Sequence, residues 1–116
     1  MKKKFELEYS INSSPKVLFN MLSTPGGLSE WFADDVNVQG KQFVFIWDGA
    51  EEFADLTNKK ENKYVRFKWL DEDDEKAYFE FRINIDELTG DVALVITDSM
   101  ELWDSQISEL KHVLGL

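Results

Sequence analysis

The longest helical pattern of the chain lies at its C-terminal end, between residues 98 and 116. Its apolar residues follow steps of three and four, which places them on one face of an α-helix. They are Met100, Trp103, Ile107, Leu110 and Leu114. Asp98 and Glu101 have the spacing of a capping box, and Gly115 suits a left-handed helix end. We therefore predict a helix roughly 25 Å long, enough to cross one face of a small sheet.

The N-terminal part predicts one strand followed by two short helices. Residues 5–11 alternate between apolar and polar types, as in a strand that is buried on one face. Ser14 and Pro15 then provide a serine cap and a proline at the first helical position. They predict a helix over residues 15–23, ended by the proline and glycines of residues 25–27, and a second helix over residues 28–32. The expected inner face of the first helix is Leu18, Met21 and Leu22, with Val17 beside them.

The pattern between residues 34 and 98 changes to a series of strands. Apolar residues recur there with a period of two, and turn-forming residues separate the segments. The predicted strands are residues 35–39, 43–47, 51–57, 64–69, 77–85 and 92–97. Residues 58–62 are expected to form a polar turn, and the five acids of residues 71–75 a solvated loop. The connections are too short for parallel crossovers, so we predict an α+β fold with an antiparallel sheet.

Length and charge narrow the classes of function. The 116 residues are enough for a single domain, residues 1–116, and the chain contains no cysteine for disulfides or thiolate chemistry. The net charge of -10 disfavours nucleic acid as a partner. No apolar run is long enough for membrane insertion, and the N-terminus lacks the apolar stretch of a signal peptide. We therefore expect a cytoplasmic protein.

The order of these elements resembles the helix-grip fold of the START-like (SRPBCC) superfamily. In that fold a curved antiparallel β-sheet of about six or seven strands wraps around a long C-terminal helix. Residues 14–19 and 27–32 resemble the opening of the heat-shock-protein ATPase activator homologue branch, where a Ser-Pro helix cap leads to Gly-Leu and then Trp-Phe. The resemblance implies a binding cavity for a small apolar or amphipathic molecule between the sheet and the C-terminal helix. This chain is shorter than the longer members, which implies a smaller cavity or none.

The candidate ligand-binding residues are the large apolar side chains expected to face this cavity. They are Trp31, Phe32, Phe43, Phe45, Trp47, Phe67, Trp69, Phe81, Ile83, Trp103 and Ile107. The resemblance places Trp31 and Phe32 at the mouth, and we expect Trp47 near the same entrance, with Trp69 and Trp103 deeper. The alternative is that Trp31 and Phe32 form a hydrophobic plug that closes the edge of the core. At the mouth, Trp31 would support less of the core than Trp103. Two interpretations stay open, because large rings either leave an apolar pocket between them or fill the core.

We expect no catalytic residue, metal site or cofactor. The chain has one histidine, His112, which falls outside the apolar stripe of its helix. Residues 71–75 lack the spacing of a calcium-binding loop, and we find neither a nucleophile motif nor a glycine-rich phosphate loop. Arg66 and Arg82 are expected to form surface pairs near Glu80.

The first functional hypothesis is therefore a non-catalytic binding module for a small apolar or amphipathic molecule. The alternative is a protein-interaction or chaperone-associated module with a filled core and an acidic outer surface, which would steer a basic partner. An enzyme of the cyclase or hydratase kind would need a positioned acid or base, and the sequence reveals none. A closed core favours the interaction module, and an apolar cavity of roughly 300 Å³ or more favours the ligand.

Overall fold

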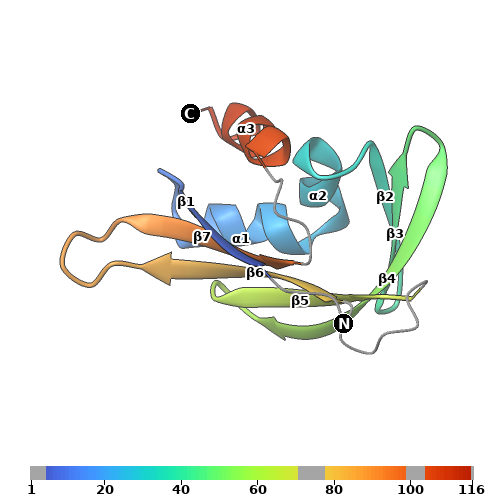
Figure 1. Cartoon of the computed structure of the whole chain (residues 1–116), viewed down its shortest axis with the longest axis horizontal. Coiled ribbons are helices and arrows are strands. Elements are labelled where there is room, and N and C mark those ends of the chain that lie inside the picture. Colours follow the sequence, from blue (N-terminus) through green and yellow to red (C-terminus); the bar gives the residue numbers. More distant parts are fainter. Residues whose placement is uncertain (1–4, 71–77, 99–103, 116) are drawn as a thin grey trace.

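The computed structural model describes residues 5–70, 78–98 and 104–115, and its helices lie on one side of a single β-sheet (Figure 1). The strands are β1 (Phe5–Ser10), β2 (Asp35–Gln39), β3 (Gln42–Trp47), β4 (Ala50–Lys60), β5 (Tyr64–Trp69), β6 (Tyr78–Ile85) and β7 (Val92–Asp98). The helices are α1 (Pro15–Ser23), α2 (Pro25–Trp31) and α3 (Asp104–Val113). This order confirms the predicted α+β fold.

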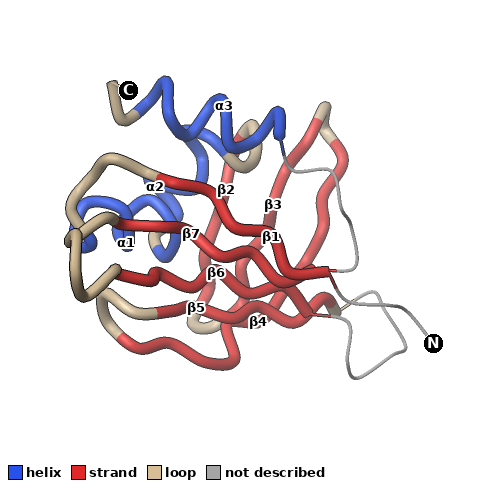
Figure 2. The backbone as a smooth tube through the Cα atoms, turned by 60° about the vertical axis from the view of Figure 1, so that its left-hand side comes forward, coloured by secondary structure: helices blue, strands red, loops and turns tan. Residues whose placement is uncertain are grey.

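The sheet has seven antiparallel strands in the order β1-β7-β6-β5-β4-β3-β2. Strands β2 to β7 form a meander of neighbouring hairpins, as the short connections predict. The first strand then pairs with the last, so β1 lies beside β7 (Figure 2). This pairing holds the N-terminal segment against the strand that precedes the C-terminal helix.

Strand β4 is longer than its sequence pattern predicts. Residues 58–60, expected in a polar turn, continue the strand to Lys60, where the partner of Lys60 on β5 is Tyr64. The register shifts between Leu56 and Asn58. Backbone pairing with β5 therefore extends the strand through residues of low strand propensity, because the ladder bonds do not depend on apolar side chains.

The described part of the C-terminal helix is α3, Asp104–Val113. Asp98, expected to cap it, is the last residue of β7 and pairs with Phe5 of β1. The reason is that β1 offers this segment a strand partner, which the local helical pattern cannot reveal. The described helix starts at Asp104. Met100, Glu101 and Trp103 lie outside the described residues.

The first helix has the bounds that its sequence predicts, but its inner face differs. Leu18 and Leu22 are buried as expected, whereas Val17 is 47% exposed and Phe19 is buried instead. The second helix, predicted over residues 28–32, begins at Pro25 and ends at Trp31, because Pro25 takes its first position instead of only ending the first helix. The Thr24 hydroxyl donates to the Asn20 carbonyl at 2.8 Å and accepts from the Gly27 N–H at 2.9 Å. Thr24 therefore joins the two helices tightly.

The hydrophobic core lies between the inner face of the sheet and the helices. Phe45, Phe67, Phe79 and Phe81, from strands β3, β5 and β6, are fully buried there. Ile107 and Leu110 of α3 are also buried in this core, and the main contact of α3 among the described elements is with α2. The C-terminal helix thus covers the core and packs chiefly against α2.

Asp86 stabilises the turn between β6 and β7. Its Oδ1 accepts from the Leu88 N–H at 2.8 Å and from the Thr89 N–H at 3.1 Å. The N–H of Thr89, followed by that of Leu88, holds the pKa of Asp86 below its ordinary value, because both bonds favour the charged carboxylate.

The stabilisation from Asp86 should therefore be present at neutral pH and disappear as the pH falls below about 4. A lowered folded-state pKa means that the unfolded chain binds the proton more readily. We expect Asp86→Asn to flatten the fall of the free energy of unfolding with acid, as measured by denaturant titrations across that range. An unchanged pH slope in this variant would show that the carboxylate is not the group responsible.

Candidate ligand-binding site

Most of the predicted ligand-binding residues meet in one aromatic cluster on the inner face of the sheet. Phe32, at the end of α2, contacts rings from two strands. Its centroid lies 5.0 Å from that of Phe45, 5.3 Å from Trp47 and 5.9 Å from Phe81. Phe32 therefore connects the residues that were predicted at the mouth with those that were predicted to line the cavity.

The described rings pack directly on one another. Phe45 and Phe67 lie 5.9 Å apart in an edge-on arrangement, and Phe43 lies 5.0 Å from Phe67. Both geometries are favourable for aromatic pairs. Phe45, Phe67 and Phe81 have no exposed surface. In this part of the core the rings are thus each other's neighbours, as in the interpretation of a filled core.

The remaining predicted residues lie around this cluster. Phe43, Ile83 and Ile107 are buried, and Trp69 is half-buried with its ring 5.9 Å from that of Phe45. Trp103 lies outside the described residues. Phe79, which the sequence pattern also predicts to face inward, contacts Phe32, Phe45, Phe67, Trp69 and Phe81. Its place as the second residue of β6, in a run of alternating apolar residues, is the signal that identifies it as core.

The aromatic cluster reaches the surface at a hollow of about 350 Å³. We call this hollow the mouth. It is lined by Ser29, Glu30, Trp31, Phe32, Ala33, Asp34, Trp47 and Glu109. Trp31, Phe32 and Trp47 thus line one hollow, which is bordered by α2, the β2–β3 hairpin and α3.

Hydrogen bonds fix both indole rings of the mouth. The Trp31 Nε1–H donates to the Met21 carbonyl at 2.8 Å, and the Trp47 Nε1–H donates to the Phe32 carbonyl at 2.8 Å. Trp31 is only 5% exposed and contacts Phe81, so it supports the core more than a mouth residue was expected to. Trp47 is half-buried. A molecule in the mouth would accordingly meet the ring of Trp47 without an indole donor.

Three carboxylates give the mouth an acidic border. Glu30 is exposed on α2, and Glu109 lies on α3. One carboxylate oxygen of Asp34 is already hydrogen-bonded within the protein, because its Oδ2 accepts from the Asp48 N–H at 2.8 Å. The border should attract cationic groups and repel anionic ones at neutral pH.

A second hollow, of about 760 Å³, lies away from all the predicted ligand-binding residues. Residues of α1 line one side of it and residues near the β4–β5 turn line the other. Val17 lines this hollow and is exposed. The helical pattern of the sequence had placed it beside the apolar face of the helix. Nothing in the sequence pattern indicates that the two segments meet.

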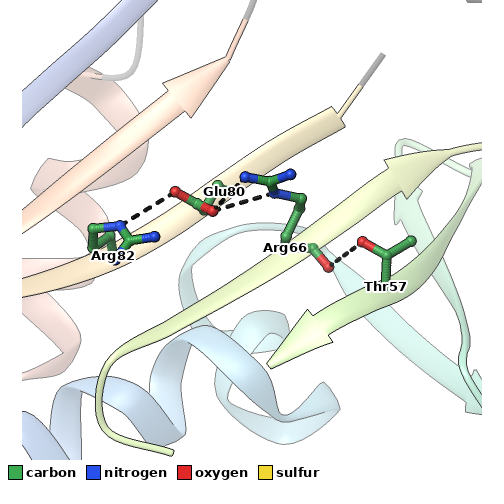
Figure 3. Close-up of polar contacts among 4 residues, drawn as sticks. All are labelled: Thr57, Arg66, Glu80 and Arg82. Atoms are coloured by element: carbon green, nitrogen blue, oxygen red, sulfur yellow. Dashed lines mark hydrogen bonds and ion pairs between the residues drawn. The ribbon is translucent and has the colours of Figure 1, made fainter. Parts of the chain in front are cut away.

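On the outer face of the sheet, Glu80 forms the predicted pairs with two arginines (Figure 3). The Arg66 Nη2–H donates to Glu80 Oε1 at 3.0 Å, and the Arg82 Nε–H donates to Glu80 Oε2 at 3.4 Å. The guanidinium groups also lie over aromatic rings, Arg66 over Tyr78 at 4.2 Å and Arg82 over Tyr64 at 4.8 Å. Both oxygens of the buried carboxylate are thus bonded, which suits a structural role.

The remaining chemistry is sparse in the part of the chain that the structure describes. His112 is exposed, as its position on the helix predicts. Among the described residues, no three His, Asp or Glu side chains gather in a way that could hold a metal ion. None of the described helices has the length and apolar content needed to cross a membrane.

Comparison with known proteins identifies the family. The model of the START-like superfamily domain matches residues 1–116. The solution NMR structure of BfR322 from Bacteroides fragilis is 40% identical over 100% of this chain and 94% of its own, with a TM-score of 0.70. No curated protein matches the chain significantly.

Two more distant structures share the fold. The Aha1 dimer from Colwellia psychrerythraea is 16% identical and covers 97% of this chain and 88% of its own, with a TM-score of 0.71. MLL2253 from Mesorhizobium loti is 18% identical and covers 97% of both chains, with a TM-score of 0.78. At these identities the likeness concerns the fold alone.

Proposed function

The chain belongs to the START-like superfamily, and on that premise we propose that it is a non-catalytic binding module for a small apolar or amphipathic molecule. The observation that carries this proposal is the mouth, where aromatic rings continuous with the core face a hollow of about 350 Å³. Pockets for small molecules measure roughly 300–1,000 Å³ and combine apolar walls with a few polar groups. The mouth has both.

Trp47 would provide the main apolar contact for the ligand. Its ring is half-buried and lies 5.3 Å from that of Phe32, so a bound molecule would cover the exposed part and extend the aromatic cluster outward. Removing that area from water is favourable at roughly 25 cal/mol per Å². Trp31 and Phe32 form the floor.

Helix α3 would act as the movable side of the mouth. It contributes Glu109 and packs chiefly on α2, while the strands are held to one another by complete ladders. A small displacement of α3 would therefore widen the entrance toward Phe32 without breaking a strand pair. This arrangement supports a ligand that lies between the sheet and the C-terminal helix.

The acidic border favours neutral or cationic ligands. Glu30, Asp34 and Glu109 would repel a carboxylate or phosphate at the mouth, and they leave uncharged molecules unaffected. Among apolar classes, we therefore expect sterols and flavonoids to bind better than fatty acids at this site.

The proposal predicts that filling the mouth abolishes binding. We expect Glu30→Trp, at an exposed position of α2, to place an indole in the hollow and weaken a neutral ligand at least about tenfold, or about 1.4 kcal/mol. The ligand would be found by screening sterols, flavonoids, fatty acids and phospholipids for a raised melting temperature, because binding to the folded state alone stabilises it. Trp31→Ala is unsuitable, since Trp31 is buried in the core.

Glu30→Gln is the matched control, because it removes the charge without adding volume. This variant should bind neutral ligands as the wild type does. If both variants bind equally well, the ligand does not occupy the mouth. If no apolar class stabilises the wild-type protein, the binding module is the wrong function.

The second candidate function is a protein-interaction or chaperone-associated module. The close packing of the described aromatic rings favours it, as does the net charge of -10, which would steer a basic partner. Failure of the ligand screen would support this alternative, and a basic partner would then be expected to bind less tightly as the salt concentration rises.

A further inference from the structure

The hollow between α1 and the β4–β5 turn is a separate groove with its own chemistry. Its volume is about 760 Å³, which lies within the range of small-molecule sites. It is lined by Lys16, Val17, Phe19, Asn20, Met21, Ser23, Lys59, Glu61 and Asn62. None of these residues lines the mouth. We call this hollow the α1 groove.

The wall formed by α1 carries apolar side chains beside polar ones. Leu18 and Leu22 turn into the core, while Val17 and Met21 lie beside them at the groove. Val17 is 47% exposed, so an apolar body that covers it would remove apolar area from water, which is favourable. Met21 is half-buried and unbranched, so it can adapt its shape to an apolar body. The helix therefore offers a ligand an uncovered apolar strip.

The charge around the groove is opposite to that of the protein as a whole. Between residues 9 and 29 the chain carries one charged residue, Lys16, and between residues 56 and 70 it carries one acid, Glu61. Lys16 and Lys59 line the groove, and Lys60 and Lys63 flank the same turn. All four are exposed. Four ammonium groups thus accompany a single carboxylate in a protein of net charge -10.

These ammonium groups are available to a ligand. Among the described residues, the ion pairs join Glu80 with Arg66 and Arg82, and none involves Lys16, Lys59, Lys60 or Lys63. The amide side chains of Asn20 and Asn62 also line the groove and can donate hydrogen bonds. An anionic head group would find cationic and neutral donors on both walls.

We propose that the α1 groove binds a small organic anion with an apolar body and a carboxylate head. The body covers Val17 and Met21, and the head lies within reach of Lys16 and Lys59. This site is independent of the proposed function at the mouth, because the two hollows share no residue and have borders of opposite charge. Charge complementarity selects the anion, and the groove volume selects a small molecule over a macromolecule.

The test uses three probes with the same chain and different heads: octanoate, octan-1-ol and octylamine. Each is titrated into the isotopically labelled protein while backbone amide and indole N–H signals are followed by NMR. We expect octanoate to shift the amides of Val17, Met21 and Asn62 and to bind at least about tenfold more tightly there than octylamine. The octanoate affinity should fall as the salt concentration rises, because exposed charges are screened.

Variants of exposed residues separate the charge from the apolar contact. Lys59→Gln combined with Lys16→Gln should weaken octanoate binding about tenfold, and the control Lys41→Gln, at an exposed lysine of the β2–β3 turn, should leave it unchanged. Val17→Glu should abolish binding by placing a carboxylate in the groove. Glu61→Gln should tighten it, since a repulsive charge is removed.

Other outcomes would overturn the proposal. Octanoate shifts confined to the Trp31 and Trp47 indole signals would place the anion at the mouth instead. Equal affinity for octanoate and octylamine would show that the lysines do not select the ligand. Acetate shifting the same amides with the same affinity as octanoate would reduce the groove to a purely electrostatic site without an apolar contact.

Discussion

Phe79→Ala should lower the free energy of unfolding by about 3–5 kcal/mol, the range for truncating a buried aromatic residue. Phe79 has no exposed surface. Its ring centroid lies 4.8 Å from Trp69, 5.0 Å from Phe67 and 5.4 Å from Phe81. These neighbours lie on β5, the middle strand of the sheet, and on β6, the strand of Phe79 itself. They cannot all move inward together, so most of the volume of the lost ring should remain as a cavity.

Phe53→Ala is the matched control for this loss. Phe53 lies on β4 and is only half-buried, so the same truncation should cost about 1 kcal/mol. Both variants would be measured by denaturant unfolding at one temperature. Equal losses would contradict the view that the described rings form the densest part of the core. A loss for Phe79→Ala below about 1 kcal/mol would mean that space already exists beside this ring.

The fold could be predicted from the sequence because the spacing of apolar residues indicates most of its helices and strands. Alternation along residues 78–85 and the helical steps of residues 15–23 predict these two elements, and the structure confirms both, although Phe19 and not Val17 is buried in the helix. Errors occur where a distant partner decides the conformation. Residues 58–60 join β4 because β5 pairs with them, and Asp98 joins β7 because β1 does. A local pattern contains no information about such partners.

The sites were less predictable than the fold. Alternation identifies Phe45 and Phe67 as inward-facing, but it cannot distinguish rings that pack together from rings that surround a pocket, because that depends on their mutual angles. The mouth was anticipated only through the resemblance to a family. The α1 groove was missed because it forms between α1 and the β4–β5 turn, which are distant in sequence. Val17 was the one residue of the groove to which the helical pattern drew attention.

Gly27→Ala should destabilise the protein by about 3 kcal/mol, at the upper end of the range for overpacking. A Cβ at Gly27 would overlap the Asn20 carbonyl oxygen and would lie 2.7 Å from the Met21 Cα and 2.9 Å from the Thr24 Oγ1. The first two are backbone atoms of α1, so relief requires the two helices to separate. Separation would also disturb the Trp31 Nε1–H bond to the Met21 carbonyl.

The neighbouring substitution Gly26→Ala is not expected to destabilise the protein. A Cβ at Gly26 has no atom within 4 Å, and alanine favours a helix by roughly 1 kcal/mol over glycine. This variant should therefore be neutral or slightly stabilising in the same denaturant titration. Helix propensity alone would make both substitutions favourable, so a clear difference in sign isolates the close approach of α1 and α2. Two stabilising results would show that the helices can separate freely. Gly27, the first residue of the Gly-Leu pair in the motif that revealed the family resemblance, would then have no packing role.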